Sequence, residues 1–288
     1  MPHVSTDALN LYRAQTFRLN PGQHLASQED AVAYVNERGF VFFWPYKGIE
    51  FPSLWSAVAG NRPVADAHDD PGHVTWGWKD GLLGQKRVYY ARVIKKRNTF
   101  LSLDLLPYFY ALSPNYGSPE EDYLIDYEAG QLTAEARAVY EALLDNGPLD
   151  TVALRKAAHL TSRGSDNLFN RALETLQTTF RILPTGVAEA GAWNYAFIYD
   201  LVTRHYPDVI EQSHPISEWE ARRHLALTAM NTLGASRTAD LQRLFGWGPT
   251  LLEKALQKLV DAGHLVDEVQ IEGKAGAIVA LSALCGEK

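Results

Sequence analysis

The chain has 288 residues, of which 46% are hydrophobic and 21% charged, a composition typical of a globular protein with two or three small domains. No apolar run approaches the length that crosses a bilayer, and the polar segment Met1–Asp7 does not resemble a secretion signal. The single cysteine, Cys285, has no intramolecular disulfide partner, so we expect a reduced, cytoplasmic protein.

Charge is distributed unevenly along the chain. Residues 118–150 hold nine acids and one base, whereas residues 85–97 hold six bases and no acid. Because the net charge of the whole chain is −7, the acidic segment accounts for all of it. A local basic stretch decides whether a face attracts phosphate, so the acidic total does not exclude nucleic-acid binding.

The first residues predict an arm, a helix and a buried apolar run, in that order. Residues 1–26 are expected to form an irregular lead-in. Ser27 can cap a helix, and Gly39 can end it. The continuously apolar run Phe40–Pro45 comes directly after this helix, and we expect it to be buried.

The next elements are short and separated by turns. Ser53 and Gly60 bound a second helix, and residues 61–72 are rich in loop formers. Residues 87–94 have the composition of a strand, and residues 100–112 fit either a strand or a helix. Residues 27–112 therefore predict a divergent copy of a helix-and-hairpin unit that is clearer later in the chain.

A second unit follows the turn-rich segment Asn115–Pro119. Thr133 can cap its first helix, and helical spacing directs Leu168 and Leu176 of its third helix toward a core. Three helices and a hairpin are expected at residues 133–147, 151–159, 165–178, 180–188 and 193–202.

The last unit gives the clearest pattern. Ser217 and Glu220 have the spacing of a capping box, and Gly234 suits the left-handed position after the last turn. Helices and strands are expected at residues 217–234, 237–245, 249–263, 264–271 and 277–281. Three helices followed by a glycine-tipped hairpin predict a winged helix-turn-helix.

These patterns predict an α+β protein built of tandem winged helix-turn-helix domains. Residues 1–117 would form a divergent N-terminal winged-helix-like domain. Residues 118–206 would form a middle winged helix with an acidic lead-in, and residues 207–288 a C-terminal winged helix.

The basic stretch is the first candidate for DNA contact. Its cations alternate with apolar and aromatic residues, and they are Lys86, Arg87, Arg92, Lys95, Lys96 and Arg97. On a pair of strands they would lie along a phosphate backbone. The solvated face of a half-buried strand explains the same pattern equally well.

The third helices of the last two units supply the other candidates, which are Asn167, Asn170, Arg171, Gln177, Lys254, Gln257 and Lys258. Side chains of these types reach base edges and phosphates. However, Glu174 and Asp261 lie among them, and mixed charge is typical of any solvated helix face. For each helix taken alone, that simpler interpretation is favoured.

Two further groups suggest chemistry. Lys79 as an amine nucleophile and Asp80 as its acid–base partner would suit a lyase. Core tryptophans beside a surface ion pair explain the same segment more simply. His68–Asp70 and His73 offer nitrogen and oxygen ligands, but a turn with polar side chains is the simpler interpretation. We therefore expect no metal and no cofactor.

Several short motifs carry a family resemblance through their order and spacing. They are Tyr199, Arg204–Pro207, Glu220–Leu225, Gly234–Arg237, Leu259–Gly263 and Glu272–Gly273. With the early block Gly39–Pro45 they resemble the AlkZ/YcaQ family over about two thirds of the chain. The resemblance implies tandem winged helices. Studied members of that family are DNA glycosylases that unhook interstrand crosslinks.

The catalytic motif of that family is Gln-x-Asp or Gln-x-Gln, often within Gly-Phe-Val-Gln-x-Asp-Pro. In the matching block of this chain, Phe42 stands at the glutamine and Trp44 at the aspartate. Neither side chain can position water or stabilise a cationic sugar. The resemblance therefore implies a relative without this chemistry. Both aromatics are expected in the core, with stacking on a base or an alkyl lesion as the alternative.

The expected function is non-catalytic binding of duplex DNA, with damage recognition as its setting. Two alternatives stay open. One is an active DNA glycosylase or lyase that uses a different set of residues, such as Lys79 and Asp80. The other is a dimeric transcription regulator.

Overall fold

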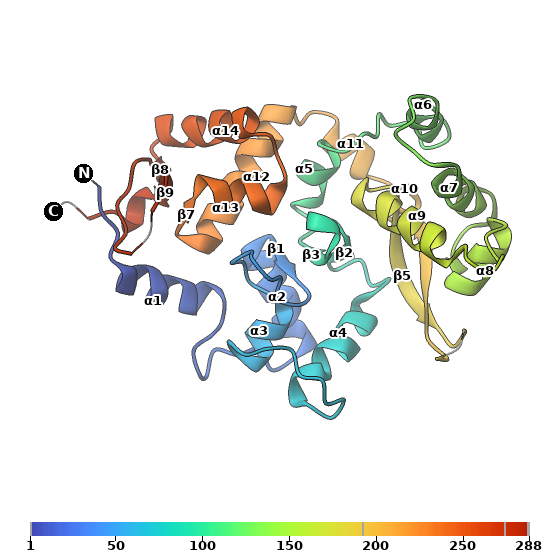
Figure 1. The fold of residues 1–288 in the computed structure, drawn as a ribbon, viewed down its shortest axis with the longest axis horizontal. Coiled ribbons are helices and arrows are strands. Elements are labelled where there is room, and N and C mark those ends of the chain that lie inside the picture. Colours follow the sequence, from blue (N-terminus) through green and yellow to red (C-terminus); the bar gives the residue numbers. More distant parts are fainter. Residues whose placement is uncertain (1, 192, 274, 287–288) are drawn as a thin grey trace.

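One order of elements, helix–strand–helix–helix–strand–strand, recurs three times in the computed structural model, which describes residues 2–191, 193–273 and 275–286 (Figure 1). The first unit contains α2 (Gln28–Arg38), β1 (Phe40–Phe42), α3 (Leu54–Ala59), α4 (Val74–Leu82), β2 (Tyr89–Arg92) and β3 (Asn98–Leu101). The second contains α7 (Ala134–Asn146), β4 (Leu149–Asp150), α8 (Thr151–Ala157), α9 (Asp166–Thr178), β5 (Ile182–Ala188) and β6 (Ala196–Leu201). The third contains α12 (Glu218–Leu233), β7 (Ala235–Arg237), α13 (Thr238–Phe245), α14 (Pro249–Asp261), β8 (Leu265–Val266) and β9 (Ile278–Leu281).

Each unit has a three-stranded antiparallel sheet of the same topology, with the strand orders β1-β3-β2, β4-β6-β5 and β7-β9-β8. The last strand of each unit is therefore central. Val41 of β1 pairs with Phe100 of β3, and Ser236 of β7 pairs with Val279 of β9. Strands β4 and β7 were not predicted, because a strand of two or three residues is too short to show alternation. The mixed helix-and-strand composition is as predicted.

The predicted helix boundaries follow from side-chain caps. Ser27, Thr133 and Ser217 each accept a hydrogen bond at their side-chain oxygen from the backbone N–H three residues later. At the other ends, Gly39 and Gly234 adopt φ of 78° and 74°, in the region that favours glycine. These helix ends are therefore determined by residues close by in the sequence and can be predicted without tertiary contacts.

The N-terminal segment corrects the first expectation, because it is a helix and not an irregular arm. Ser5 caps α1 (Thr6–Thr16), and Leu9 is buried against the sheet of the third unit, where it packs in one cluster with Ala235 and Ile278. Figure 1 shows α1 beside β7 at the outer end of the molecule. Burial of one face stabilises a helix whose sequence is polar overall.

Residues 100–112, which fitted either a strand or a helix, contain both, since β3 ends at Leu101 and α5 begins at Leu106. Two positions of α9 differ from the expectation. Leu168 is 43% exposed, because Phe169 and Leu173 form the buried face of the helix instead. Gln177 is only 2% exposed, because the last turn of α9 is covered by β2 of the first unit.

The remaining elements connect and cover the units. They are η1 (Pro71–His73), η2 (Ile94–Lys96), α5 (Leu106–Tyr110), α6 (Asp122–Glu128), α10 (Val202–His205), α11 (Val209–Ser213) and η3 (Ser282–Leu284). Within the described ranges, no helix combines the length and apolar character needed to cross a membrane.

Strand β1 sends alternate side chains into two different cores. Phe40 and Phe42 join a cluster that includes Leu225 of α12, whereas Val41 and Phe43 join the first unit's own cluster. Side chains of a strand point to opposite faces in turn, so the continuous apolar run is explained by burial on both faces. The first and third units therefore share a core.

Gly39 makes the close approach of β1 to α12 possible. A Cβ on Gly39 would lie 2.6 Å from Cγ2 of Thr228. By contrast, Gly22 has a similar φ of 82° and open space around it.

We expect Gly39→Ala to lower the free energy of unfolding by about 2–4 kcal/mol, because backbone strain and overpacking add. Gly22→Ala should cost only the strain, about 1 kcal/mol. Urea unfolding of both variants measures the difference. Equal losses would mean that Thr228 moves aside and that the contact is not tight.

Candidate nucleic-acid interface

A pocket of about 330 Å³ opens where β1 ends, and we call it the β1 pocket. Its walls come from the segment after β1, from the β2–β3 connection and from α9. The lining residues are Phe43, Trp44, Pro45, Tyr46, Arg92, Lys96, Arg97, Asn98 and Glu174. Aromatic rings, cations and one carboxylate thus meet beside Trp44, one of the two positions where the family resemblance places a catalytic motif.

The two motif positions have different environments. Phe42 is 1% exposed and contacts Phe51 edge to face, with ring centroids 6.1 Å apart, so it is a core residue. Trp44 is 38% exposed and lines the β1 pocket. Its ring stacks on Phe43 with centroids 5.4 Å apart and meets Trp76 of α4 edge to face at the same distance. The core interpretation therefore fits Phe42 and not Trp44.

The β2–β3 connection presents cations from a strained turn. Lys95 and Lys96 of η2 adopt φ of 53° and 60°, a conformation that costs a residue with a side chain about 1 kcal/mol or more. The Nζ of Lys95 lies 3.7 Å from the position that a Cβ on Gly246, at the end of α13, would occupy. The guanidinium of Arg97 lies 4.5 Å from the ring centre of Tyr46. The turn is thus held between neighbouring elements with its charges outward.

Helix α9 is docked on this region by its last two turns. The amide oxygen of Gln177 accepts the backbone N–H of Arg92 at 3.2 Å, and the hydroxyl of Thr178 donates to the Arg92 carbonyl at 3.1 Å. Glu174 Oε1 pairs with Nζ of Lys96 at 2.9 Å. The acid that made this helix face look unsuited to DNA is therefore neutralised by the basic stretch.

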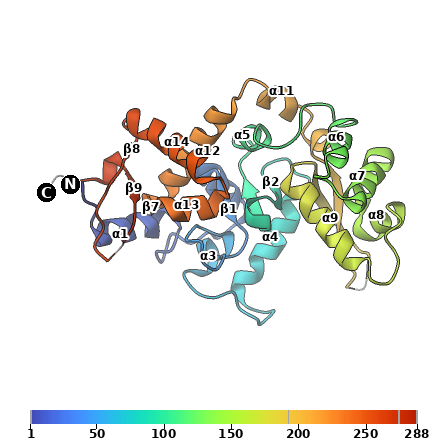
Figure 2. The ribbon, with the colours of Figure 1, turned by 45° about the horizontal axis from the view of Figure 1, so that its top comes forward.

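The N-terminal half of α9 stays exposed. Asn167, Asn170 and Arg171 are all exposed, and their spacing from Glu174 places them on the same side of the helix. Figure 2 shows one end of α9 next to β2, where Gln177 and Thr178 bond to Arg92. The polar face of α9 and the β1 pocket therefore form one continuous surface, a relation that the linear sequence did not reveal.

The basic stretch is divided by the fold, so its six cations do not form one row. Arg87 makes a two-pronged ion pair with Glu29. Lys86 lines a different pocket, beside His205, whose pKa is lowered mainly by burial and further by the Lys86 charge. Residues 89–91 between the two ends are buried. The predicted strand pair is present as β2 and β3, but it does not carry the six cations in one row, and Arg92 with Lys95–Arg97 forms the cationic group at the β1 pocket.

Lys79 is enclosed by aromatic rings. Its side chain is fully buried, with Nζ 4.4 Å from the ring centre of Trp76 and 4.6 Å from that of Phe197. The ammonium donates to the Tyr195 hydroxyl at 2.7 Å and pairs with Asp80 at 2.8 Å. Tyr195 also donates to Asp80 at 2.8 Å. The Lys79–Asp80 ion pair, predicted at the surface, is thus buried at its lysine end. Through Tyr195 it joins α4 to the β5–β6 hairpin.

Burial lowers the pKa of Lys79, and Asp80 opposes this shift. Burial also raises the pKa of Tyr195, with the Asp80 hydrogen bond as a second cause. The Lys79 side chain has no exposed surface. A nucleophilic role for Lys79 would therefore require the surrounding rings to move apart.

The other candidates lie apart from the β1 pocket. Lys254, Gln257 and Lys258 of α14 are exposed and line a separate groove with Trp219 at the start of α12. Gln257 and Lys258 both contact Asp261, and Lys254 lies 5.3 Å from the Trp219 ring centre. This groove shares no lining residue with the β1 pocket.

The histidine-rich loop uses its polar groups internally. Asp70 pairs with Arg62 through both oxygens and accepts the backbone N–H of Gly72. Nε2 of His73 contacts the carbonyl of Ala65 at 2.9 Å. In the described part of the chain, no three metal-ligating side chains are grouped to hold an ion.

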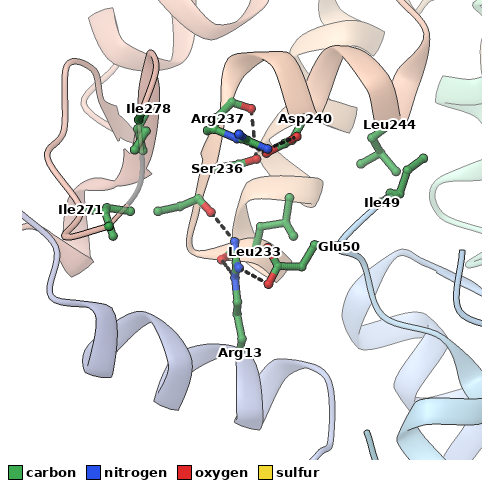
Figure 3. A pocket seen from close by; sticks show the side chains of 13 residues that line it. Arg13, Ile49, Glu50, Leu233, Ser236, Arg237, Asp240, Leu244, Ile271 and Ile278 are labelled. Carbon is green, nitrogen blue, oxygen red and sulfur yellow. Dashed lines mark hydrogen bonds and ion pairs between the residues drawn. The ribbon is translucent and has the colours of Figure 1, made fainter. Parts of the chain in front are cut away.

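Another pocket, of about 320 Å³, lies between α1 and the third unit (Figure 3). Arg13 donates to the carbonyls of Leu233 and Ala235 at 2.9 and 2.7 Å and pairs with Glu50. Arg237 pairs with Asp240 through Nε and Nη2 (Figure 3). The charges of this pocket are therefore matched internally, and Arg13 attaches α1 to the third unit.

We expect Lys79→Met to change the free energy of unfolding by less than about 1 kcal/mol, since the apolar stem is retained and Asp80, whose side chain is 25% exposed, keeps water and the Tyr195 hydroxyl as partners. Lys79→Ala should lower it by about 3 kcal/mol through the cavity it leaves. Urea unfolding distinguishes the two. A loss in Lys79→Met as large as in Lys79→Ala would show that the ammonium itself holds the cage.

The pKa of Lys79 also makes the stability of the protein depend on pH. The folded protein releases the Lys79 proton at lower pH than the unfolded chain, whose value is near 10.5. The stability of the wild-type protein relative to Lys79→Met should therefore rise as pH increases through the interval below 10.5.

Comparison with known proteins places the chain in a family. A family described as AlkZ related matches residues 25–246, and no curated protein matches the chain significantly in sequence. The fold is similar to that of the Streptomyces sahachiroi DNA glycosylase AlkZ, with a TM-score of 0.58 and 14% sequence identity. The match covers 98% of this chain and 71% of that one. The chain therefore belongs to the AlkZ-related family.

Proposed function

We propose that this protein binds duplex DNA without the glycosylase chemistry of its relatives, in the recognition of damaged DNA. The observation that carries the proposal is the cationic group Arg92, Lys95, Lys96 and Arg97 at the β1 pocket, next to the exposed polar half of α9. Among the described residues, Lys96 alone of these four pairs with a carboxylate. The other three charges are available for phosphate.

We further propose that the three units are winged helices. The repeated order of elements and the repeated sheet topology support this, with α4, α9 and α14 as third helices and the following hairpins as wings. The domains would be residues 1–117, 118–206 and 207–288. The acidic segment lies on α6, α7 and their turns, which Figures 1 and 2 both place at the far end from α14.

The proposed contacts divide by chemistry. Arg92, Lys95 and Arg97 would bind phosphates, with Arg171 extending the track along α9. Asn167 and Asn170, one turn apart on that helix, can donate to and accept from base edges or phosphates. Lys86, Arg87, Lys254, Gln257 and Lys258 would make peripheral contacts, since they lie outside the β1 pocket.

The motif positions support the absence of the family's chemistry. Phe42 is a core residue, so a glutamine there would bury an amide among aromatic rings at a cost of several kcal/mol. Trp44 has no group that titrates or activates water. The residues at these positions therefore stabilise the fold or contact a ligand.

A salt series tests the binding proposal. We expect fluorescence anisotropy of labelled duplex DNA to report affinity that falls steeply with salt concentration. The double variant Lys95→Asn, Arg97→Gln should reduce the slope of log K against log salt by about 1.8, because each phosphate contact contributes about 0.9. Asparagine tolerates the left-handed backbone of position 95, so the turn is kept.

Lys156→Gln is the matched control for this experiment, since Lys156 is an exposed cation on α8, outside the β1 pocket. It should leave the slope unchanged. No binding by the wild-type protein at low salt, or an unchanged slope in the double variant, would contradict the proposal.

A glycosylase that uses another residue set is the second candidate, and Glu174 favours it as the carboxylate that lines the β1 pocket. This candidate predicts release of the damaged base from alkylated duplex by the wild-type protein and none by Glu174→Gln. Release is measured as strand cleavage after alkali treatment. Equal release by both proteins would remove Glu174 from consideration.

A further inference from the structure

The exposed ring of Trp44 is the starting point. An indole that is 38% exposed beside a pocket has lost part of its contact with water without gaining a full set of packing partners. Its neighbour Phe43 is 2% exposed, so one side of the indole is supported by a buried ring. The pocket therefore presents a flat aromatic surface to whatever enters it.

This surface is backed by Trp76 and, next to it, the buried Lys79. Trp76 meets Trp44 edge to face, and the buried ammonium of Lys79 lies 4.4 Å from the Trp76 ring centre. Lys79 is in turn fixed by Asp80 and Tyr195. A ring held in place before binding loses little conformational entropy when a ligand stacks on it, which favours tight binding.

The remaining walls are polar and match a nucleotide. Arg92, Lys96 and Arg97 carry positive charge at one side of the pocket, and the side-chain amide of Asn98 and the carboxylate of Glu174 offer hydrogen-bonding groups. A volume of about 330 Å³ lies at the lower end of the range for small-ligand sites, enough for one base with its sugar. Exposed aromatics beside cations are the usual arrangement for binding unstacked bases.

We propose that the β1 pocket binds a single unpaired base of DNA, stacked on Trp44, with the adjacent phosphates on Lys96 and Arg97. This inference rests on the proposed DNA binding and adds a ligand class, because paired bases of a duplex cannot present a free face to Trp44. Phosphate binding by Lys96 would compete with its ion pair to Glu174, which then becomes available to the base.

The test compares three labelled duplexes of the same sequence in anisotropy titrations. One is fully paired, one carries a single unpaired base in a bulge, and one carries an abasic residue in the same bulge. We expect the wild-type protein to bind the base bulge about tenfold or more tightly than the paired duplex, as stacking of one base allows. The abasic bulge should bind like the paired duplex, which excludes flexibility of the DNA as the cause.

Trp44→Ala should abolish the preference for the base bulge over the paired duplex, whereas Trp44→Phe should keep part of it. Trp219→Ala is the matched control, because Trp219 is 45% exposed and lies under Lys254 in the separate groove. It should keep the full preference. Circular dichroism and thermal unfolding check that each variant is folded.

Two outcomes overturn the inference while the proposed function survives. In the first, wild-type protein binds the paired and base-bulged duplexes equally. In the second, Trp44→Ala keeps the preference. If wild-type protein binds none of the duplexes at low salt, the proposed DNA binding fails and the inference fails with it.

Discussion

Burial of β1 on both faces is the constraint on which the rest of the structure depends. Its three residues and the next one alternate between the core shared with α12 and the first unit's own core. This fixes the strand relative to two bodies of the protein at once, with Gly39 allowing the close approach to Thr228. Phe43 is the last buried residue of this run, and Trp44 is partly exposed. The β1 pocket lies at this change from buried to exposed residues. The position of the candidate site thus follows from packing.

The same constraint explains why Phe42 and Trp44, at the motif positions that the family resemblance implies, have different surroundings. An amide at position 42 would lie in a buried site between the rings of Tyr46 and Phe51, where its desolvation is costly unless a hydrogen bond offsets it. An aromatic side chain there adds packing between the first and third units. At position 44 the backbone has left the core, and a tryptophan can keep one side supported while the other faces the pocket. Phe42 therefore contributes packing in the core, whereas Trp44 lines the β1 pocket.

Charge in this protein is organised by tertiary contact. Glu174 would weaken an anion-binding face if α9 stood alone, but docking of α9 on β2 pairs it with Lys96. Lys95 and Lys96 are held at positive φ, so the fold maintains a strained turn in order to present them. Lys79 shows the opposite case, a cation withdrawn from solvent into a cage of rings. It stabilises the contact between two units and supports Trp76 behind Trp44.

The sequence alone was sufficient for the local structure and the family. Caps at Ser27, Thr133 and Ser217 and the stops at Gly39 and Gly234 are encoded within a few residues, so they could be predicted without a fold. The ordered short motifs likewise indicated the AlkZ-related family. Failures arose where a distant partner decides the outcome. Helix α1 forms on the third unit, Gln177 is buried by β2, and Lys79 is buried by the β5–β6 hairpin.

The candidate site shows the same division. Its residue types were recognisable in the sequence as a basic stretch, a polar helix and two unusual aromatics. The sequence did not reveal that these residues come together, since Trp44, Arg97 and Glu174 lie in three segments far apart in the chain. Alternation and capping act over a few residues, whereas the exposure of Trp44, the burial of Phe42 and the pairing of Glu174 depend on which elements pack together. Local sequence therefore determined most of the elements, and tertiary packing decided that α1 forms and which side chains face the β1 pocket.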